Sequence, residues 1–236
     1  NNTDYSVNGV MRDGTNPAAP ANINWVGGYD GAPTSPISLA RYWLYTFDNY
    51  VNEYANWHQI QENTAIRVGQ GFTLKGSGAS GNQNYTFVGK PNNGSITTNT
   101  VAKDQLLLTG NPYPSALNIV VFLDDNKSSI DGTLYFWEHY TTNNTHILRD
   151  YQGGYAERNY VGGVAPVSPT LISGLGSSTR IPGQFVPVGQ GFFVIGNTST
   201  GGTITFNNSQ RGFQKENETT SNTMFKTSSN KKTQAT

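Results

Sequence analysis

The pentapeptide Val68-Gly-Gln-Gly-Phe72 recurs unchanged as Val188-Gly-Gln-Gly-Phe192. Each copy leads into alternating apolar residues, a turn rich in Gly, Ser and Asn, and a second strand-like segment, at residues 85–87 and 204–206. Alternation with a period of two predicts β-strands, and repeated strand pairs are typical of structural scaffolds. The repeat therefore predicts an all-β, internally duplicated fold that contains antiparallel hairpins.

The composition of the 236-residue chain agrees with this fold and excludes several classes of function. Hydrophobic residues make up 35% and charged residues 13%, while 27 glycines and 13 tyrosines suit short aromatic strands joined by polar turns. The 15 basic and 15 acidic residues balance, so the chain lacks the positive charge that nucleic acid or an anionic membrane would attract. Cysteine is absent, which excludes thiolate metal sites and thiol catalysis. No apolar run approaches the roughly 20 residues of a membrane span, so we expect neither nucleic-acid binding nor membrane insertion.

Three further segments are predicted to be strands, two because aromatic residues fill them and one, at 105–109, because its short apolar run is typical of a buried strand. They are residues 41–47, 105–109 and 134–139. Short strands between turn signals are typical of an antiparallel β-sandwich, here jelly-roll-like. The duplication leaves two arrangements open, two related sandwich units or one large sandwich.

The same patterns predict a division of the chain. A first sandwich repeat, truncated at its N-terminus, is expected at residues 1–104. A second repeat is expected at 105–214, with a loop insertion at 140–183. Residues 215–236 are polar and rich in Asn, Ser and Thr, which predicts a flexible tail or linker.

Five stretches of sequence occur in a specific order. They read Leu-Thr-Gly-Asn-Pro-Tyr-Pro-Ser-Ala at 108–116, Gly-Thr-Leu-Tyr-Phe-Trp-Glu-His at 132–139, Tyr-Gln-Gly-Gly-Tyr at 151–155, Val-Pro-Val-Gly-Gln-Gly-Phe-Phe-Val at 186–194 and Phe-Asn-Asn-Ser-Gln-Arg at 206–211. In this order they resemble a region of large secreted cell-surface proteins of Bacteroidetes that the type IX secretion system exports. In those proteins the region lies just upstream of the C-terminal sorting domain.

This resemblance, which covers residues 65–215, implies an extracellular, cell-surface, β-rich module. It also implies contact with the type IX secretion machinery during export and with neighbouring domains of the same protein. It carries no catalytic residues over to this chain. We expect the chain to be a fragment of such a protein, because it shows neither a leader at its start nor a sorting domain at its end.

One loop-like segment could bind a structural Ca²⁺ ion. Asp124, Asp125, Asn126 and Asp131 could together supply the oxygen ligands that this hard cation prefers, although their spacing does not fit an EF-hand. The alternative is a solvated turn, since Asp and Asn readily form turns. No other cofactor is expected.

Catalytic constellations are weak in this sequence. Glu138 could pair with Asp150 or Glu157 as in glycoside hydrolases, but alternation with Trp137 predicts that Glu138 faces solvent while the tryptophan faces the core. No Gly-x-Ser-x-Gly elbow supports a serine hydrolase. Three histidines are predicted to be single surface residues rather than zinc ligands: His58, His139 and His146. We therefore expect a protein that is not an enzyme, with a hydrolase as the least favoured interpretation.

The aromatic residues are the main functional signal. Trp and Tyr beside Asn and Gln suit stacking on sugar faces and hydrogen bonding to hydroxyls. Five aromatic residues are expected to fill the core: Trp43, Phe72, Phe87, Trp137 and Phe192. Four tyrosines of the insertion are the candidate ligand-binding residues: Tyr140, Tyr151, Tyr155 and Tyr160.

Together these observations predict a non-enzymatic extracellular surface module. It would serve a type IX-secreted protein as a structural spacer or adhesion element, with possible binding of a surface glycan or another partner. The alternative is an accessory carbohydrate-binding domain of a secreted polysaccharide-degrading enzyme. A strip of exposed Tyr and Trp side chains would favour binding, whereas complete burial of these side chains would favour a spacer.

Overall fold

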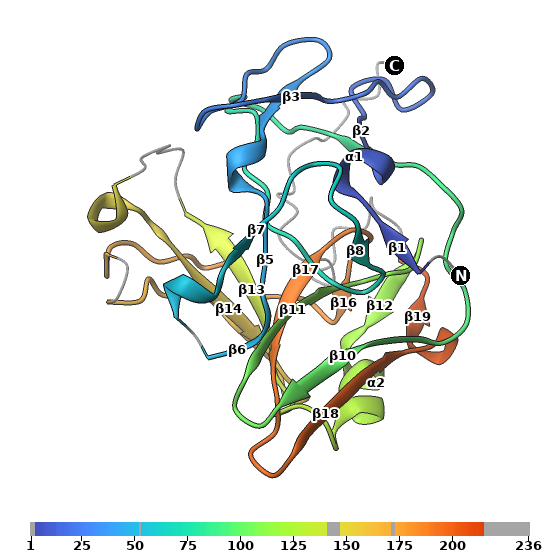
Figure 1. Cartoon of the computed structure of the whole chain (residues 1–236). Helices are drawn as coiled ribbons and strands as arrows, with labels where there is room; N and C mark the ends of the chain where they lie inside the picture. Colours follow the sequence, from blue (N-terminus) through green and yellow to red (C-terminus); the bar gives the residue numbers. More distant parts are fainter. Residues whose placement is uncertain (1–2, 52, 141–146, 171–172, 215–236) are drawn as a thin grey trace, which may run out of the picture.

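The computed structural model describes residues 3–51, 53–140, 147–170 and 173–214 (Figure 1). Its helices are α1 (Val7–Val10), α2 (Ile119–Asn126) and the 3-10 helices η1 (Arg41–Trp43), η2 (Tyr54–Asn56), η3 (Leu148–Asp150) and η4 (Asn208–Gln210). Its strands are β1 (Asp4–Tyr5), β2 (Met11–Asp13), β3 (Asn24–Val26), β4 (Ser38–Ala40), β5 (Tyr45–Thr46), β6 (Asp48–Tyr50), β7 (His58–Gln59), β8 (Ile66–Arg67), β9 (Tyr85–Phe87), β10 (Ile96–Ala102), β11 (Leu106–Gly110), β12 (Ala116–Asn118), β13 (Leu134–His139), β14 (Gly153–Arg158), β15 (Gly163–Val164), β16 (Phe185–Val186), β17 (Gly191–Ile195), β18 (Gly201–Phe206) and β19 (Arg211–Gly212). Within the described ranges, no helix is long and apolar enough to cross a membrane.

The largest sheet has six strands in the order β15-β14-β13-β17-β11-β6, all antiparallel. A three-stranded sheet, β16-β12-β19, and the ribbon β10-β18 lie across the core from it, together with α2 (Figure 1). Of the smaller pairs, β3 and β4 run parallel. This arrangement confirms the predicted all-β, sandwich-like fold.

The main core fills the space between these layers. It is built from side chains of the six-stranded sheet, the β10-β18 ribbon, the three-stranded sheet and α2. Phe122 of α2 contacts Phe192 of β17, with ring centroids 5.6 Å apart, and Phe206 of β18, at 5.1 Å. The helix therefore closes the open side of the sandwich with an aromatic contact to each layer.

A second core lies in the N-terminal part of the chain. Val7, Leu39, Leu44 and Ile60 are among its buried members. Short strands β1 to β5 and β7 to β9 surround it. The described part of residues 1–36 contributes α1 and strands β1 to β3 to this region.

The two Val-Gly-Gln-Gly-Phe copies form the same turn. In each, the amide of the glutamine, Gln70 or Gln190, donates to the carbonyl three residues earlier, at 3.0 and 3.4 Å. Gly69 and Gly189 take φ values of +91° and +73°, a conformation that glycine adopts without the steric cost that a Cβ brings. The repeated sequence therefore encodes a repeated local structure.

Both turns meet at one strand. Gly71 N–H donates to the Leu108 carbonyl at 3.0 Å along one edge of β11, and Gln70 forms a bridge with Thr109. Along the other edge, Thr109 pairs with Phe192 of β17. The two copies thus flank the end of β11 from opposite sides.

The predicted hairpins within each copy are wrong. Strand β17 pairs with β11 and β13, whereas β18 pairs with β10 in a separate ribbon. In the first copy, β9 pairs with β2. Alternation of apolar and polar residues predicts that a segment is a strand, but it does not predict which strand pairs with it. Here β17 and β18 pair with partners distant in sequence, because that pairing buries their apolar faces between the two layers.

Two of the three further predicted strands are confirmed, as β11 and β13. The third prediction, a strand at 41–47, is wrong over its first half. Residues Arg41–Trp43 form η1, because Leu44 N–H donates back to the Arg41 carbonyl at 3.1 Å, and β5 begins only after it. Leu44 itself is fully buried in the second core.

Strands on either side of the predicted 104/105 boundary share sheets. Strand β6 pairs with β11, and β10 pairs with β18. The segment expected as the loop insertion 140–183 contributes β14 and β15 to the six-stranded sheet. The division of the chain into two repeats stays a prediction.

Candidate aromatic binding face

Strand β13 presents two different faces because its side chains alternate. Leu134 and Phe136 are fully buried in the main core. Tyr135 and Trp137 point to the opposite, outer side of the six-stranded sheet and are half-buried. Trp137 pairs directly with Tyr155 of β14 across the ladder, so residues on two adjacent strands contribute rings to one outer face.

Ring contacts run without a break across this outer face. Trp57 lies 5.7 Å from Phe193, and Phe193 lies 5.7 Å from Tyr155, measured between ring centroids. Tyr155 lies 4.9 Å from Trp137, and Trp137 lies 6.0 Å from Tyr151 with the two ring planes only 15° apart. We call this surface the aromatic face, and its ring residues are Phe47, Tyr50, Trp57, His58, Trp137, His139, Tyr151, Tyr155 and Phe193.

The aromatic face is partly covered and partly open. Phe47 and Phe193 are buried, at 1% and 5% exposure, and anchor the layer on the sheet. Tyr50 is 39% exposed, whereas Trp137 and Tyr155 are half-buried. The face therefore offers rigid rings to solvent, supported from beneath by buried ones.

A glycine makes room for the central tryptophan. A Cβ on Gly153 would lie 2.6 Å from the Trp137 ring, far inside contact distance. The absence of a side chain at this position lets the indole lie over β14. Gly154, the next residue, faces the inner side of the sheet, where a Cβ would collide with the Tyr140 hydroxyl. Both glycines of the Tyr-Gln-Gly-Gly-Tyr stretch are therefore needed for close packing, one on each side of the sheet.

The phenol groups of Tyr151 and Tyr155 remain protonated near neutral pH. Burial raises the pKa of Tyr155 to about 12 and also raises the pKa of Tyr151. A protonated phenol both donates and accepts hydrogen bonds. The face thus combines apolar ring surface with neutral polar groups.

The structure does not bring the four predicted tyrosines together. Tyr151 and Tyr155 lie on the aromatic face. Tyr140 lies toward the inner side of the sheet, and its buried hydroxyl has no hydrogen-bond partner among the described residues. Tyr160, 43% exposed, lies beside Gly132. Trp57 and Phe193 were missed as members of a binding face, although the alternation of aromatic residues at 135 and 137 was a signal for the face as a whole.

Of the five aromatic residues predicted to be in the core, Phe192 is confirmed at 1% exposure. Phe87 is 43% exposed and is not a core residue. Trp43, Phe72 and Trp137 are half-buried. Aromatic content therefore identified the strands better than it identified the core, because a ring suits a half-buried sheet surface as well as an interior.

The prediction that Glu138 faces solvent is wrong. Glu138 is 6% exposed and shares the inner face of β13 with Phe136. Ser178 donates its hydroxyl to Glu138 Oε1 at 3.0 Å, and Arg180 Nη1 lies 3.4 Å from the same oxygen. Oε2 is buried and has no partner within the described residues. The more exposed side of β13 carries Tyr135 and Trp137, so the alternation along the strand places Glu138 on the buried side.

The paired carboxylates considered for hydrolysis do not face each other. Glu138 lies opposite Gly154 in the ladder, on the inner side of the sheet, whereas Glu157 lies opposite Tyr135 and is exposed on the outer side. Asp150 forms an ion pair with Arg149, with a 3.6 Å N–O distance. The three carboxylates therefore do not line one cleft.

Burial of Glu138 predicts a pH-dependent stability. Loss of solvation raises the pKa of this carboxyl above its ordinary value, against the opposing effects of Ser178 and Arg180. The folded state therefore holds the proton more tightly than the unfolded state, and the contribution of Glu138 to stability is lost as pH rises through the raised pKa. We expect Glu138→Gln to abolish this loss. The difference in melting temperature, variant minus wild type, should therefore increase as the pH rises from about 4 to about 7. Thermal unfolding of both proteins at each pH measures this, and a gap that is constant or that closes with pH would contradict it.

The four predicted calcium ligands lie in and after α2. Asp124 forms an ion pair with Lys127 at 3.1 Å, and Asp125 accepts hydrogen bonds from Asn207 and Gln210, both at 2.8 Å. The alternative prediction, a solvated turn between Leu123 and Ile130, is confirmed in part, since residues 127–129 form a turn, whereas Asp124, Asp125 and Asn126 form the end of α2.

The other two candidates have separate partners. Asn126 is 2% exposed and bonds the backbone of Thr205 in both directions, at 3.0 and 2.8 Å. Asp131 accepts from the Tyr135 hydroxyl at 2.9 Å. Calcium binding stays a prediction.

The described histidines are placed separately. His58 is exposed on β7, and His139 stacks on Tyr151 at 4.9 Å. His146 lies outside the described residues. Within the described part of the chain, no group of three His, Cys, Asp or Glu side chains could hold a metal ion.

These features define a class of protein, an all-β sandwich-like domain with an aromatic layer on the outer face of its largest sheet. The model of a family described as a domain of unknown function, DUF8693, matches residues 26–236. The chain belongs to this family, and the match spans both copies of the Val-Gly-Gln-Gly-Phe sequence. No curated protein and no solved structure matches it.

Proposed function

We propose that this domain is a non-enzymatic, extracellular surface module that binds glycan chains through its aromatic face. Within a type IX-secreted protein it would act as an adhesion element and as a spacer between neighbouring domains. The observation that carries the proposal is the unbroken series of ring contacts from Tyr50 to His139 on the outer side of the six-stranded sheet. The extracellular and secretory parts of the proposal rest on the resemblance of the ordered sequence stretches.

The chemistry of the face suits sugars. Pyranose rings stack on aromatic side chains through their C–H groups, and their hydroxyls need neutral hydrogen-bonding partners nearby. The half-buried Trp137, Tyr151 and Tyr155 supply ring surface. Trp137 and Tyr155 are held by their strands, β13 and β14, and Tyr151 stacks on Trp137. A sheet surface of this width favours an extended oligosaccharide over a single sugar.

A glycan array followed by calorimetry tests the proposal. We expect the wild type to bind a neutral oligosaccharide, for which cellohexaose, xylohexaose and chitohexaose are the first probes. Trp137→Ala is expected to weaken this binding at least about tenfold, because a stacked ring contributes roughly 1.4 kcal/mol or more. The matched control is Tyr42→Ala, which removes an aromatic side chain that is 37% exposed on η1 and outside the aromatic face.

The outcomes separate the candidate functions. If the Trp137→Ala and Tyr42→Ala variants bound the glycan with equal affinity, the aromatic face would not be the binding site. If no probe or array glycan binds, the domain acts as a spacer alone. Retention on insoluble cellulose or xylan, lost in the Trp137→Ala variant, would favour the accessory carbohydrate-binding domain of a polysaccharide-degrading enzyme.

A further inference from the structure

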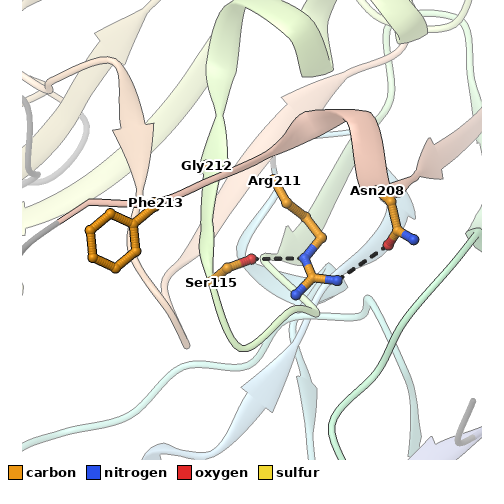
Figure 2. Close-up of a pocket in the computed structure, with 5 residues that line it drawn as sticks. All are labelled: Ser115, Asn208, Arg211, Gly212 and Phe213. Carbon is orange, nitrogen blue, oxygen red and sulfur yellow. Dashed lines mark hydrogen bonds between the residues drawn. The ribbon is translucent and has the colours of Figure 1, made fainter.

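A hollow lined by both polar and aromatic side chains lies across the molecule from the aromatic face, where β12 begins and β19 ends. Figure 2 shows the residues that line it: Ser115, Asn208, Arg211, Gly212 and Phe213. Strands β12 and β19 belong to the three-stranded sheet, on the right of Figure 1, whereas β13 and β14 lie on the left. The hollow is therefore a separate surface that the proposed function does not use.

Arg211 is held in this hollow by neutral groups. Its Nε donates to Ser115 Oγ at 3.0 Å, and its Nη1 donates to Asn93 Oδ1 at 3.0 Å and to Asn208 Oδ1 at 3.4 Å (Figure 2). The guanidinium carbon lies 5.3 Å from the ring centre of Tyr113. The side chain is thus fixed in position before any ligand arrives.

The positive charge of Arg211 is not balanced by a carboxylate of the described residues, since none of them lies within 4 Å of the guanidinium. Within the same residues Nη2 makes no hydrogen bond. The contact to Asn208 is long, so a carboxylate could replace it and bind Nη1 and Nη2 side by side. This fork geometry is the one that guanidinium groups prefer for carboxylates.

The surroundings favour a sugar as the carrier of that carboxylate. Phe213 is 84% exposed beside the hollow and offers a ring face to stack on a pyranose. Ser115 and Asn208 supply neutral groups for sugar hydroxyls. From these contacts we propose that the hollow binds an acidic sugar, a hexuronate whose carboxylate pairs with Arg211 and whose ring packs on Phe213. This site is independent of the aromatic face.

Titrations of the ¹⁵N-labelled domain with sodium glucuronate test the site, with glucose, sodium acetate and sodium chloride at equal concentration as controls. We expect saturable amide shifts confined to residues around Ser115 and 208–213, with glucuronate binding more tightly than acetate and no effect of glucose. Arg211→Gln is expected to weaken glucuronate binding at least about tenfold, since the charge-assisted pair is lost. Phe213→Ala, at an exposed position that leaves folding intact, is expected to weaken it about threefold.

Specific results would overturn the proposal. If sodium chloride produced the same amide shifts, or if acetate and glucuronate bound with equal affinity, the hollow would not recognise the sugar ring and the proposal would be wrong. Unchanged binding by Phe213→Ala would do the same, even if Arg211→Gln failed to fold. Trp137→Ala should bind glucuronate as the wild type does, so loss of binding in that variant would assign the ligand to the aromatic face. If neutral oligosaccharides failed to bind, the proposed function of the aromatic face would be wrong, but the proposed glucuronate site in the hollow would be unaffected. The two proposals can therefore be contradicted separately.

Discussion

Replacing Phe192 by alanine is expected to lower the free energy of unfolding by about 3–5 kcal/mol, the range for deleting a buried phenylalanine ring. Phe192 is 1% exposed, and its ring contacts Phe122 of α2 at 5.6 Å and Phe136 of β13 at 5.7 Å. The variant loses the contacts that join the helix to the six-stranded sheet and leaves a cavity between them. Chemical denaturation with a linear extrapolation measures the loss, which should lower the melting temperature by about 10 °C.

The neighbouring phenylalanine is the matched control. Phe193 points to the other side of β17, contacts Trp57 and Tyr155 at 5.7 Å each, and is 5% exposed. We expect Phe193→Ala to cost less stability, because the half-buried rings around it can close over the gap, and to weaken glycan binding by disturbing the aromatic face. Equal stabilities of the two alanine variants, or a glycan affinity that depends on Phe192 alone, would contradict this division of the two rings.

The second large effect is expected at the duplicated pentapeptide. A Cβ on Gly71 would lie 2.7 Å from the Thr109 carbonyl oxygen and 2.9 Å from Leu108 Cγ, both closer than real Cβ contacts. The equivalent atom on Gly191 would lie 3.4 Å from the same carbonyl oxygen, at ordinary van der Waals distance. We therefore expect Gly71→Ala to cost about 1–3 kcal/mol through overpacking, and Gly191→Ala to change stability by less than about 1 kcal/mol.

Because the two glycines occupy the same position of the same sequence, each variant controls for the other. Denaturation midpoints of both variants and of the wild type measure the difference. Neither glycine has a positive φ in the structure, so backbone strain cannot account for the result. Equal losses in the two variants would mean that β11 can move away from Gly71, and would contradict the close approach.

The sequence alone was sufficient for the fold class, the central strands and the duplicated turn. Residues 106–110 and 134–139 are strands as their composition predicts, because a short apolar run suits a buried strand and aromatic side chains suit a pleated sheet. The two Val-Gly-Gln-Gly-Phe copies adopt the same turn because glycine at a positive φ is a local requirement. These properties depend on neighbours close in sequence, and a single sequence displays them directly.

Assignment of faces needed the tertiary structure. The alternation of Trp137 and Glu138 predicts that they point to opposite sides, and they do, yet the carboxylate rather than the indole points inward. Strand β13 packs on the main core on one side and carries half-buried rings of the aromatic face on the other. Alternation with a period of two shows which side chains share a face of the strand. It does not show which of the two faces is buried more deeply.

The two candidate sites also depend on contacts that no local pattern contains. Phe193 lies between Trp57 and Tyr155 only because β17 and β14 join one sheet, and Arg211 reaches Tyr113 only because β19 lies beside β12. The sequence by itself determined which residue types and turns were present. The tertiary structure alone decided which of these residues are in contact. Distant strands are brought together by the burial of apolar surface, which is non-directional and depends on all layers of the fold at once.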